Sequence, residues 1–231
     1  TKATGAQTTS NGVEVALEKP DGKTELVHVA KLLVATGRRP LTEGIGLESV
    51  SITPDRGFVP VDGYMRTAAE GVYAIGDIVA TPALAHVASA EGIVAVEHIA
   101  AHPTRPVDYG RIPGCTYCTP EVASVGLTEA GAREKGYAVK AGKFPFAALG
   151  KSQIHGNMEG FVKLVSDEQY GEILGVHMIG PHATELIGEA CALLGGGFTV
   201  EELGRTVHAH PTLSEAMLEA AHLVAGHAIH S

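Results

Sequence analysis

The sequence has 231 residues, 45% hydrophobic and 19% charged, which is enough for one large domain or two small ones with a proper core. A formal net charge of −9 at pH 7 and the lack of any basic block argue against a nucleic-acid-binding surface. No apolar run reaches the roughly 18 residues that a membrane span needs, and the first residues lack the apolar core of a signal peptide. Three cysteines fit a reducing compartment, so we expect a cytoplasmic protein with neither nucleic-acid nor membrane partners.

Residues 11–36 carry the pattern of β-strands. Apolar and polar residues alternate from Val13 to Leu17, a PDGK turn follows, and a second apolar stretch then predicts a hairpin. The short apolar run at 31–36 (KLLVAT) ends on Gly37, as a buried strand with a tight exit does. A glycine at that place lets another backbone or a nucleotide approach closely.

Loops are predicted for residues 41–66, which are rich in Gly and Pro. The next segment, 67–77, predicts another apolar strand, which ends on Gly76 and Asp77. Ligands of open α/β sheets bind beyond the carboxyl ends of strands, so Asp77 could accept hydrogen bonds from sugar-like hydroxyls. The alternative is that Asp77 only caps the next turn.

A helix is predicted for residues 83–101, and its small side chains suggest close packing on both sides. His86 falls in its first turn. The free N–H groups and partial positive charge of a helix N-terminus suit an anionic or electron-rich ring edge. For His86 alone, a packed or solvated histidine is the simpler interpretation.

After a Pro-rich boundary at 101–106 the pattern becomes α+β rather than repeating βαβ. Strands are predicted at 122–126, 142–146, 161–165 and 173–179, and helices at 128–135, at 183–194, after Thr199 and from Pro211 towards Val224. Thr199 and Glu202 have the spacing of a capping box.

The cysteines predict neither a redox pair nor a metal site. Cys115 and Cys118 lie in a segment that reads as extended, where side chains three positions apart point to opposite faces. A zinc site would need a second ligand pair with matching spacing, and the sequence has none. Cys191 lies beside the apolar stripe of the 183–194 helix, where we expect it to be buried.

Residues 208–216 (HAHPTLSEA) place a histidine on a turn before a helix. His210 precedes Pro211, which favours an extended backbone, and Thr212 and Glu215 have capping-box spacing. A histidine oriented by a carboxylate is the usual arrangement for general acid–base catalysis near neutral pH. The alternative is that Thr212 and Glu215 form a capping box without any chemistry.

Together these stretches resemble the C-terminal half of the dihydrolipoamide dehydrogenases, in the pyridine nucleotide–disulfide oxidoreductase family, over nearly the whole chain. Residues 33–40 (LVATGRRP), with Gly37, are similar to the end of the nicotinamide-nucleotide domain. Residues 72–77 (VYAIGD) are similar to the second flavin motif, in which Asp77 would contact the ribityl chain. The resemblance also identifies the helix start near the isoalloxazine ring, formed by Ala83, Leu84, Ala85 and His86.

The C-terminal part resembles the dimerisation domain of the family at 117–121, 142–146 and 208–216. The resemblance implies that His210 is the acid–base residue, that Glu215 orients it, and that this histidine serves the active site of the partner subunit. It also implies FAD and NAD as cofactors, and oxidation of protein-bound dihydrolipoamide through a redox disulfide. The implied partners are a second copy of the chain and the lipoyl domains of 2-oxoacid dehydrogenase or glycine cleavage complexes.

Two family features are absent, since the chain has no G-x-G-x-x-G motif and no cysteine pair separated by four residues. The implied fold class is therefore α/β and α+β, with a partial nucleotide- and flavin-binding α/β region followed by an α+β dimerisation domain. The expected divisions are the tail of the NAD-binding domain at 1–40, the last part of the FAD-binding domain at 41–109 and the dimerisation domain at 110–231. Two alternatives are another disulfide reductase, such as glutathione reductase, and a stand-alone dimerisation module without catalysis.

Overall fold

The structure is a computed structural model and describes residues 1–230. It begins with an antiparallel three-stranded sheet of order β1-β2-β3, formed by β1 (Lys2–Thr9), β2 (Gly12–Glu18) and β3 (Thr24–Val29). The predicted hairpin is confirmed as β2 and β3, whereas β1 has no apolar alternation and was not predicted. Val15 is the one fully buried apolar residue of this sheet, so the sheet contributes little to any core.

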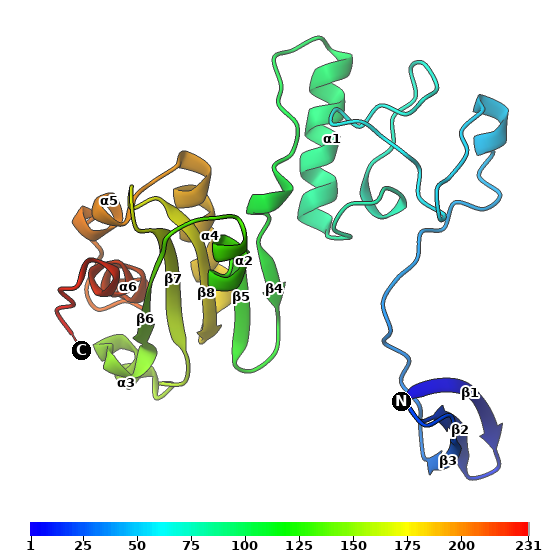
Figure 1. Cartoon of the computed structure of the whole chain (residues 1–231), viewed down its shortest axis with the longest axis horizontal. Helices are drawn as coiled ribbons and strands as arrows, with labels where there is room; N and C mark the ends of the chain where they lie inside the picture. The colour runs from blue at the N-terminus through cyan, green and yellow to red at the C-terminus, as the bar shows by residue number, and fades with distance from the viewer. Residues whose placement is uncertain (231) are drawn as a thin grey trace.

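The strand expected at 31–36 does not form. This segment is an extended tether between the first sheet and the rest of the molecule (Figure 1), with Leu33 and Val34 87% and 73% exposed. An apolar run becomes a strand only when neighbours pair its N–H and C=O groups, and residues 1–230 place no strand beside it. The strand expected before Gly76 is likewise reduced to one bridge between Arg66 and Tyr73.

The middle of the chain is mostly loop around one long helix, α1 (Ala85–Ile99). The loops enclose a small cluster of buried side chains, formed by Ile52, Val59, Ala74 and Val79. The predicted helix is confirmed, and Val87 and Val94 lie on its buried face. The expected packing on both sides is wrong, because Ile93, Val96 and Ile99 are exposed.

The last and largest part contains a five-stranded antiparallel sheet. Its order is β4-β5-β8-β7-β6, formed by β4 (Gly114–Thr116), β5 (Glu121–Gly126), β6 (Val139–Pro145), β7 (Phe161–Asp167) and β8 (Ile173–Gly180). The four strands predicted from apolar patterning are confirmed. The three-residue edge strand β4 was too short to predict from its sequence.

Five helices accompany this sheet: α2 (Glu129–Glu134), α3 (Gly150–His155), α4 (Ala183–Gly196), α5 (Val200–Arg205) and α6 (Glu215–Ala225). The α+β order expected from the sequence is confirmed, although α3 was not predicted. α4 ends at Gly197, whose φ of 69° is the left-handed conformation that glycine adopts at helix ends. The capping box of Thr199 and Glu202 is present at the start of α5. Short 3-10 turns occur at Leu47–Val50, Gly76–Ile78, Tyr109–Arg111 and Phe146–Ala148.

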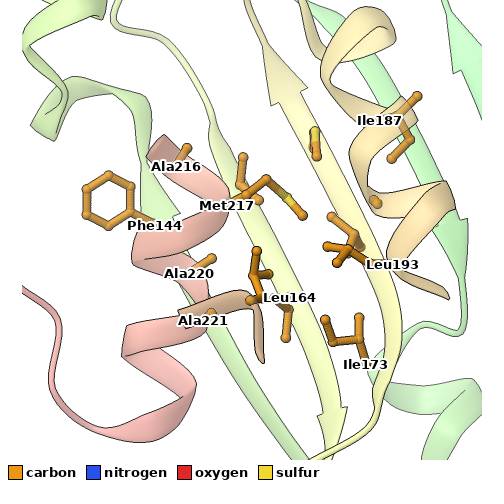
Figure 2. Close-up of a cluster of buried hydrophobic side chains, with 14 of the residues drawn as sticks. Phe144, Leu164, Ile173, Ile187, Leu193, Ala216, Met217, Ala220 and Ala221 are labelled. Atoms are coloured by element: carbon orange, nitrogen blue, oxygen red, sulfur yellow. The ribbon is translucent and has the colours of Figure 1, made fainter. Parts of the chain in front are cut away.

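The main core lies between the five-stranded sheet and the helices α4 and α6. α4 packs on β5 and β8, while α6 packs on β6 and β7, and Figure 2 shows their side chains meeting over the sheet. α6 approaches β6 so closely that a Cβ on Gly142 would lie 2.3 Å from the Ala220 carbonyl oxygen. This contact fixes the position of α6, which begins at Glu215 of the predicted site. No helix among residues 1–230 has both the length and the apolar character for crossing a membrane.

The start of α4 predicts a dependence of stability on pH. The Glu121 carboxylate accepts hydrogen bonds from the Thr184 hydroxyl at 2.7 Å and from the Thr184 N–H at 2.9 Å, and these bonds lower the pKa of Glu121. Because this pKa is lower in the folded state than the roughly 4.3 of an unfolded Glu, the contribution to stability is present above that pH. It is lost as the pH falls through the lowered value.

Glu121→Gln is therefore expected to make the free energy of unfolding less sensitive to pH below about 4.5. Urea denaturation at pH 3.5 and pH 7 measures this sensitivity. Glu185→Gln, in the first turn of the same helix, is the control, because no described group donates a hydrogen bond to the Glu185 carboxylate. Equal acid sensitivity of Glu121→Gln and the unmodified chain would contradict the assignment.

Candidate functional site

His210 and Glu215 form a hydrogen-bonded pair at the start of α6. The distance from His210 Nδ1 to Glu215 Oε1 is 2.8 Å. The other carboxylate oxygen, Oε2, accepts a hydrogen bond from the Thr212 N–H at 2.8 Å. The His210 side chain is 73% exposed, and no described group forms a hydrogen bond with its Nε2. The pair thus presents one ring nitrogen to solvent and holds the other against a carboxylate.

The turn before α6 differs in detail from the predicted capping box. The N-cap is Ser214 rather than Thr212, and the Thr212 hydroxyl donates to the Ala209 carbonyl at 2.7 Å instead of capping the helix. The other half of the motif is present, since Glu215 accepts the Thr212 N–H. The peptide bond between His210 and Pro211 is cis. Glu215 therefore supports both the turn and the histidine.

The electrostatics of the pair favour a charged carboxylate. Partial burial acts to raise the pKa of Glu215, but the Thr212 N–H and the His210 ring outweigh this effect, so the pKa is lowered. A carboxylate that accepts from Nδ1 fixes the neutral ring in the tautomer with a free lone pair on Nε2. This is the arrangement of a general base whose conjugate acid is stabilised by a neighbouring negative charge.

The predicted cofactor segments are brought together by Arg38. Its guanidinium donates to Asp77 Oδ2 at 2.6 Å and to the carbonyl oxygen of Ala83. The Arg38 and Asp77 side chains are both largely exposed. Gly37 has a φ of 110°, a conformation that favours glycine, and no atom lies within 4 Å of where a Cβ would be. Arg38 thus joins the end of the tether to Asp77 and to the residues before α1.

The first turn of α1 carries unpaired backbone donors. Leu84 occupies the N-cap position and its side chain makes no capping hydrogen bond. Within residues 1–230 no group accepts the N–H of Ala85 or of His86, while the His86 ring bonds the Pro113 carbonyl through Nε2 at 3.0 Å. These two N–H groups are therefore available to an electron-rich ligand. The His86 ring, by contrast, links α1 to the segment before β4.

Glu91 is a buried carboxylate that sequence reasoning missed. It accepts the Gly76 N–H at 2.7 Å and the Tyr109 hydroxyl at 2.9 Å. Burial, and then the bond to Glu91, raises the pKa of Tyr109 to about 12. Glu91 fixes the turn that carries Asp77 and joins it to the segment before β4. Its place in the apolar stripe of Val87 and Val94 was the signal that could have identified it.

The two candidate sites do not meet within one chain. α6 packs on β6 and β7, near one edge of the five-stranded sheet, whereas α1 lies beyond the β4 edge (Figure 1). No contact in the part of the chain that the structure describes joins His210 to Asp77 or His86. An active site that uses both needs a second chain or a large rearrangement.

The cysteines lie apart from these sites and are free thiols. Cys115 is half-buried on β4, and burial raises the pKa of its thiol. Cys118 is exposed, with its sulfur 3.1 Å from the Pro120 carbonyl oxygen. Cys191 is half-buried rather than fully buried, and burial raises its pKa also. Across residues 1–230, no cluster of three or more His, Cys, Asp or Glu side chains could hold a metal ion.

Comparison with known proteins gives matches to one family along most of the chain. The family model described as pyridine nucleotide-disulphide oxidoreductase matches residues 1–92, and that of its dimerisation domain matches residues 112–221. The dihydrolipoyl dehydrogenase of Bacillus subtilis is 48% identical over 96% of this chain and 47% of its own length. That of Thermus scotoductus is 49% identical over 100% of this chain and 50% of its own length.

Solved structures agree with these matches. LpdA from Mycobacterium tuberculosis superposes with a TM-score of 0.87 and 30% identity, over 96% of this chain and 48% of that protein. RclA from Escherichia coli, described as a flavoprotein disulfide reductase, superposes equally well, at 0.87, but its 24% identity shows the fold alone. The chain spans about half the length of the curated relatives it matches. The chain belongs to the pyridine nucleotide–disulfide oxidoreductase family.

Proposed function

We propose that this chain supplies the acid–base pair and part of the flavin site of a dihydrolipoamide dehydrogenase, which oxidises protein-bound dihydrolipoamide with NAD⁺. The observation that carries the proposal is the 2.8 Å contact of His210 with Glu215, which leaves Nε2 free. Substrate thiols react only as thiolates, so the reaction needs a base. His210 Nε2 takes the thiol proton, and Glu215 stabilises the imidazolium that forms.

The residues of the middle segment fit part of a flavin site. Asp77 offers an exposed carboxylate that can accept hydrogen bonds from ribityl hydroxyls, and the free N–H groups of Ala85 and His86 face a place where an electron-rich ring edge would be stabilised. Ala83 and Leu84 complete this turn, and Gly37 would lie on the NAD side. FAD, when bound, would carry the electron pair from the reduced, dithiol form of the redox cysteine pair to NAD⁺.

The proposed organisation divides the chain at residues 40 and 109. Residues 1–40 are the end of the NAD-binding domain, 41–109 the last part of the FAD-binding domain, and 110–231 the dimerisation domain. The uncovered apolar side chains of the first two parts, such as Leu33, Val34 and Ile93, support packing against further protein. The part from 110 onward has its own core, which supports its role as an interface domain.

The chain is expected to be a homodimer through residues 110–231. Obligate interfaces in such enzymes bury roughly 2,000 Å² or more and are strongly apolar. A dimer would also resolve the separation of His210 from Asp77, if each histidine serves the flavin site of its partner. Light scattering of the purified chain at micromolar concentration measures the mass, and a monomeric mass would contradict the expectation.

The function is tested by combining this chain with the half of a related dihydrolipoyl dehydrogenase that the chain does not match. That half is supplied either as a fusion or as a second chain. We call the result the assembled enzyme. It should be yellow with bound flavin and should reduce NAD⁺ with dihydrolipoamide, whereas the chain alone should not, because it lacks a redox cysteine pair and Gly-rich loops. An assembled enzyme that reduces only glutathione disulfide would identify a different disulfide reductase. A colourless, inactive but dimeric product would identify a dimerisation module.

The proposed physiological partners are lipoyl domains of 2-oxoacid dehydrogenase or glycine cleavage complexes, in the cytoplasm. The names of the relatives and the three free thiols support this setting. Assays with a lipoylated domain, compared with free dihydrolipoamide, test the partner. A kcat/KM no higher for the domain than for the free compound would argue against it.

A further inference from the structure

His208 lies two residues before His210 and is held in a different way. Its side chain is only 6% exposed, against 73% for His210. The His208 Nε2 lies 2.8 Å from Oε1 of Glu189 on α4, and its Nδ1 lies 3.0 Å from the Thr206 carbonyl oxygen. Both ring nitrogens of this buried histidine are therefore engaged, whereas His210 has one free.

The two partners of His208 require two protons on its ring. A carbonyl oxygen can only accept a hydrogen bond, and so can the Glu189 carboxylate. A neutral imidazole has one N–H and can satisfy one of them, while the imidazolium satisfies both. The charged groups that act on His208 are Glu189 from α4 and Glu215 from α6, and both are carboxylates. The bond to Glu189 raises the pKa of His208 in spite of burial.

The backbone on both sides of His208 is also restrained. The Thr206 hydroxyl donates to the Glu202 carbonyl at 2.9 Å, and the Ala209 carbonyl accepts from the Thr212 hydroxyl at 2.7 Å. His208 adds the link from this turn to α4, which is itself packed on the sheet. Among residues 1–230, the bond to Glu215 is the one hydrogen bond that His210 makes through its ring, so the direction of that ring depends on the turn.

We propose that His208 is a positioning residue, which as an imidazolium paired with Glu189 ties the turn of residues 206–212 to α4 and so holds His210 against Glu215. The proposal rests on the acid–base role proposed for His210, but it concerns a separate ion pair. The link is complete below about pH 6.5, the ordinary pKa of a histidine, provided that Glu189 is ionised, and it weakens as the pH rises through the raised pKa of His208.

The proposal is tested by NMR on the chain itself, with its histidine ring nitrogens labelled with ¹⁵N. Two-bond ¹H–¹⁵N correlation spectra recorded between pH 5 and 9 show which ring nitrogens carry a proton. His208 should keep two protonated nitrogens to a higher pH than an ordinary histidine does, and neutral His210 should show a single tautomer protonated on Nδ1. Glu189→Gln should lower the pH at which His208 loses its second proton, and should make the His210 tautomers average. His208→Gln should have the same effect on His210.

Glu185→Gln is the matched control, because it makes the same change one turn earlier on α4 and should leave both spectra unchanged. Loss of the second His208 ring proton at the same pH in Glu189→Gln and in the unmodified chain would overturn the ion pair. A fixed His210 tautomer in both Glu189→Gln and His208→Gln would overturn the positioning role.

An activity measurement separates this proposal from the proposed function. In the assembled enzyme, Glu189→Gln should lower kcat for dihydrolipoamide and leave KM unchanged. The loss should shrink as the pH rises through the raised pKa of His208, because the unmodified enzyme then loses the same link. A loss that stays the same from pH 6 to pH 9 would contradict the role of the charge. If the unmodified assembled enzyme does not oxidise dithiols while the spectra of the chain behave as expected, the proposed function fails and the ion pair stands.

Discussion

His210→Gln is expected to lower dihydrolipoamide oxidation by the assembled enzyme by about 10²–10⁴-fold, which is the usual contribution of a positioned acid–base group. Glutamine keeps a polar side chain on the exposed turn but cannot take a proton from a thiol. Flavin binding and dimer formation should persist, because the His210 ring has one hydrogen-bond partner in the described part of the chain and lies outside the core. The initial rate of NAD⁺ reduction at saturating dihydrolipoamide measures the loss.

Glu215→Gln is expected to have a smaller effect than His210→Gln. It leaves the base in place, and it removes the negative charge that stabilises the imidazolium. Because Glu215 also accepts the Thr212 N–H at the start of α6, the stability of the variant must be measured by denaturation alongside its rate. A larger loss for Glu215→Gln than for His210→Gln, in an equally stable protein, would contradict the assigned roles.

Phe144→Ala is expected to lower the free energy of unfolding of the C-terminal part by about 3–5 kcal/mol, which is typical of a buried aromatic side chain. Phe144 is fully buried on β6, beneath α6, where Figure 2 shows it beside Ala216 and Ala220. Truncation removes apolar area from the core and leaves a cavity that the packed sheet and helix cannot fill. Urea denaturation followed by circular dichroism gives the change from the midpoint and slope.

Tyr170→Ala is the control for Phe144→Ala, since Tyr170 is an aromatic residue of the same part that is 74% exposed. Its effect should lie within about 0.5 kcal/mol. A change below about 1 kcal/mol for Phe144→Ala would mean that the core between β6 and α6 is not packed as described.

The C-terminal part could be predicted from sequence because its information is local and its core is complete. The stripe of Ile187, Ala190 and Leu194 identified α4, and the largely apolar stretch 161–165 identified β7. The capping box of Thr199 gave the start of α5 within one residue. Each of these elements finds its partner within the same stretch of chain, so local pattern and tertiary packing agree.

The failures occurred where an element needs neighbours that residues 1–230 do not supply. The run at 31–36 has the composition of a buried strand, yet it is an exposed tether because no strand pairs with it. Periodicity reports the side chains that a segment could bury, and it carries no information on whether partners are present. The exposed face of α1 at Ile93 and Val96 has the same cause.

The site was predictable where its residues are close in sequence. His210 and Glu215 are five residues apart, and the motif that contains them suggested their contact. Arg38 and Asp77 are 39 residues apart, and Glu189 and His208 are 19 apart, so these contacts are set by the tertiary fold. A single Glu on a helix belongs to no sequence pattern that predicts such a distant partner.

The ratio of two activities in His210→Gln tests the acid–base role most directly. One is dihydrolipoamide oxidation, and the other is reduction of an artificial acceptor by NADH, which uses the flavin but no dithiol. We predict that dihydrolipoamide oxidation falls by about 10²–10⁴-fold while acceptor reduction is unchanged, so that their ratio falls by the same factor. An equal fall in both, with the ratio unchanged, would show that His210 only supports the structure and would contradict the proposed mechanism.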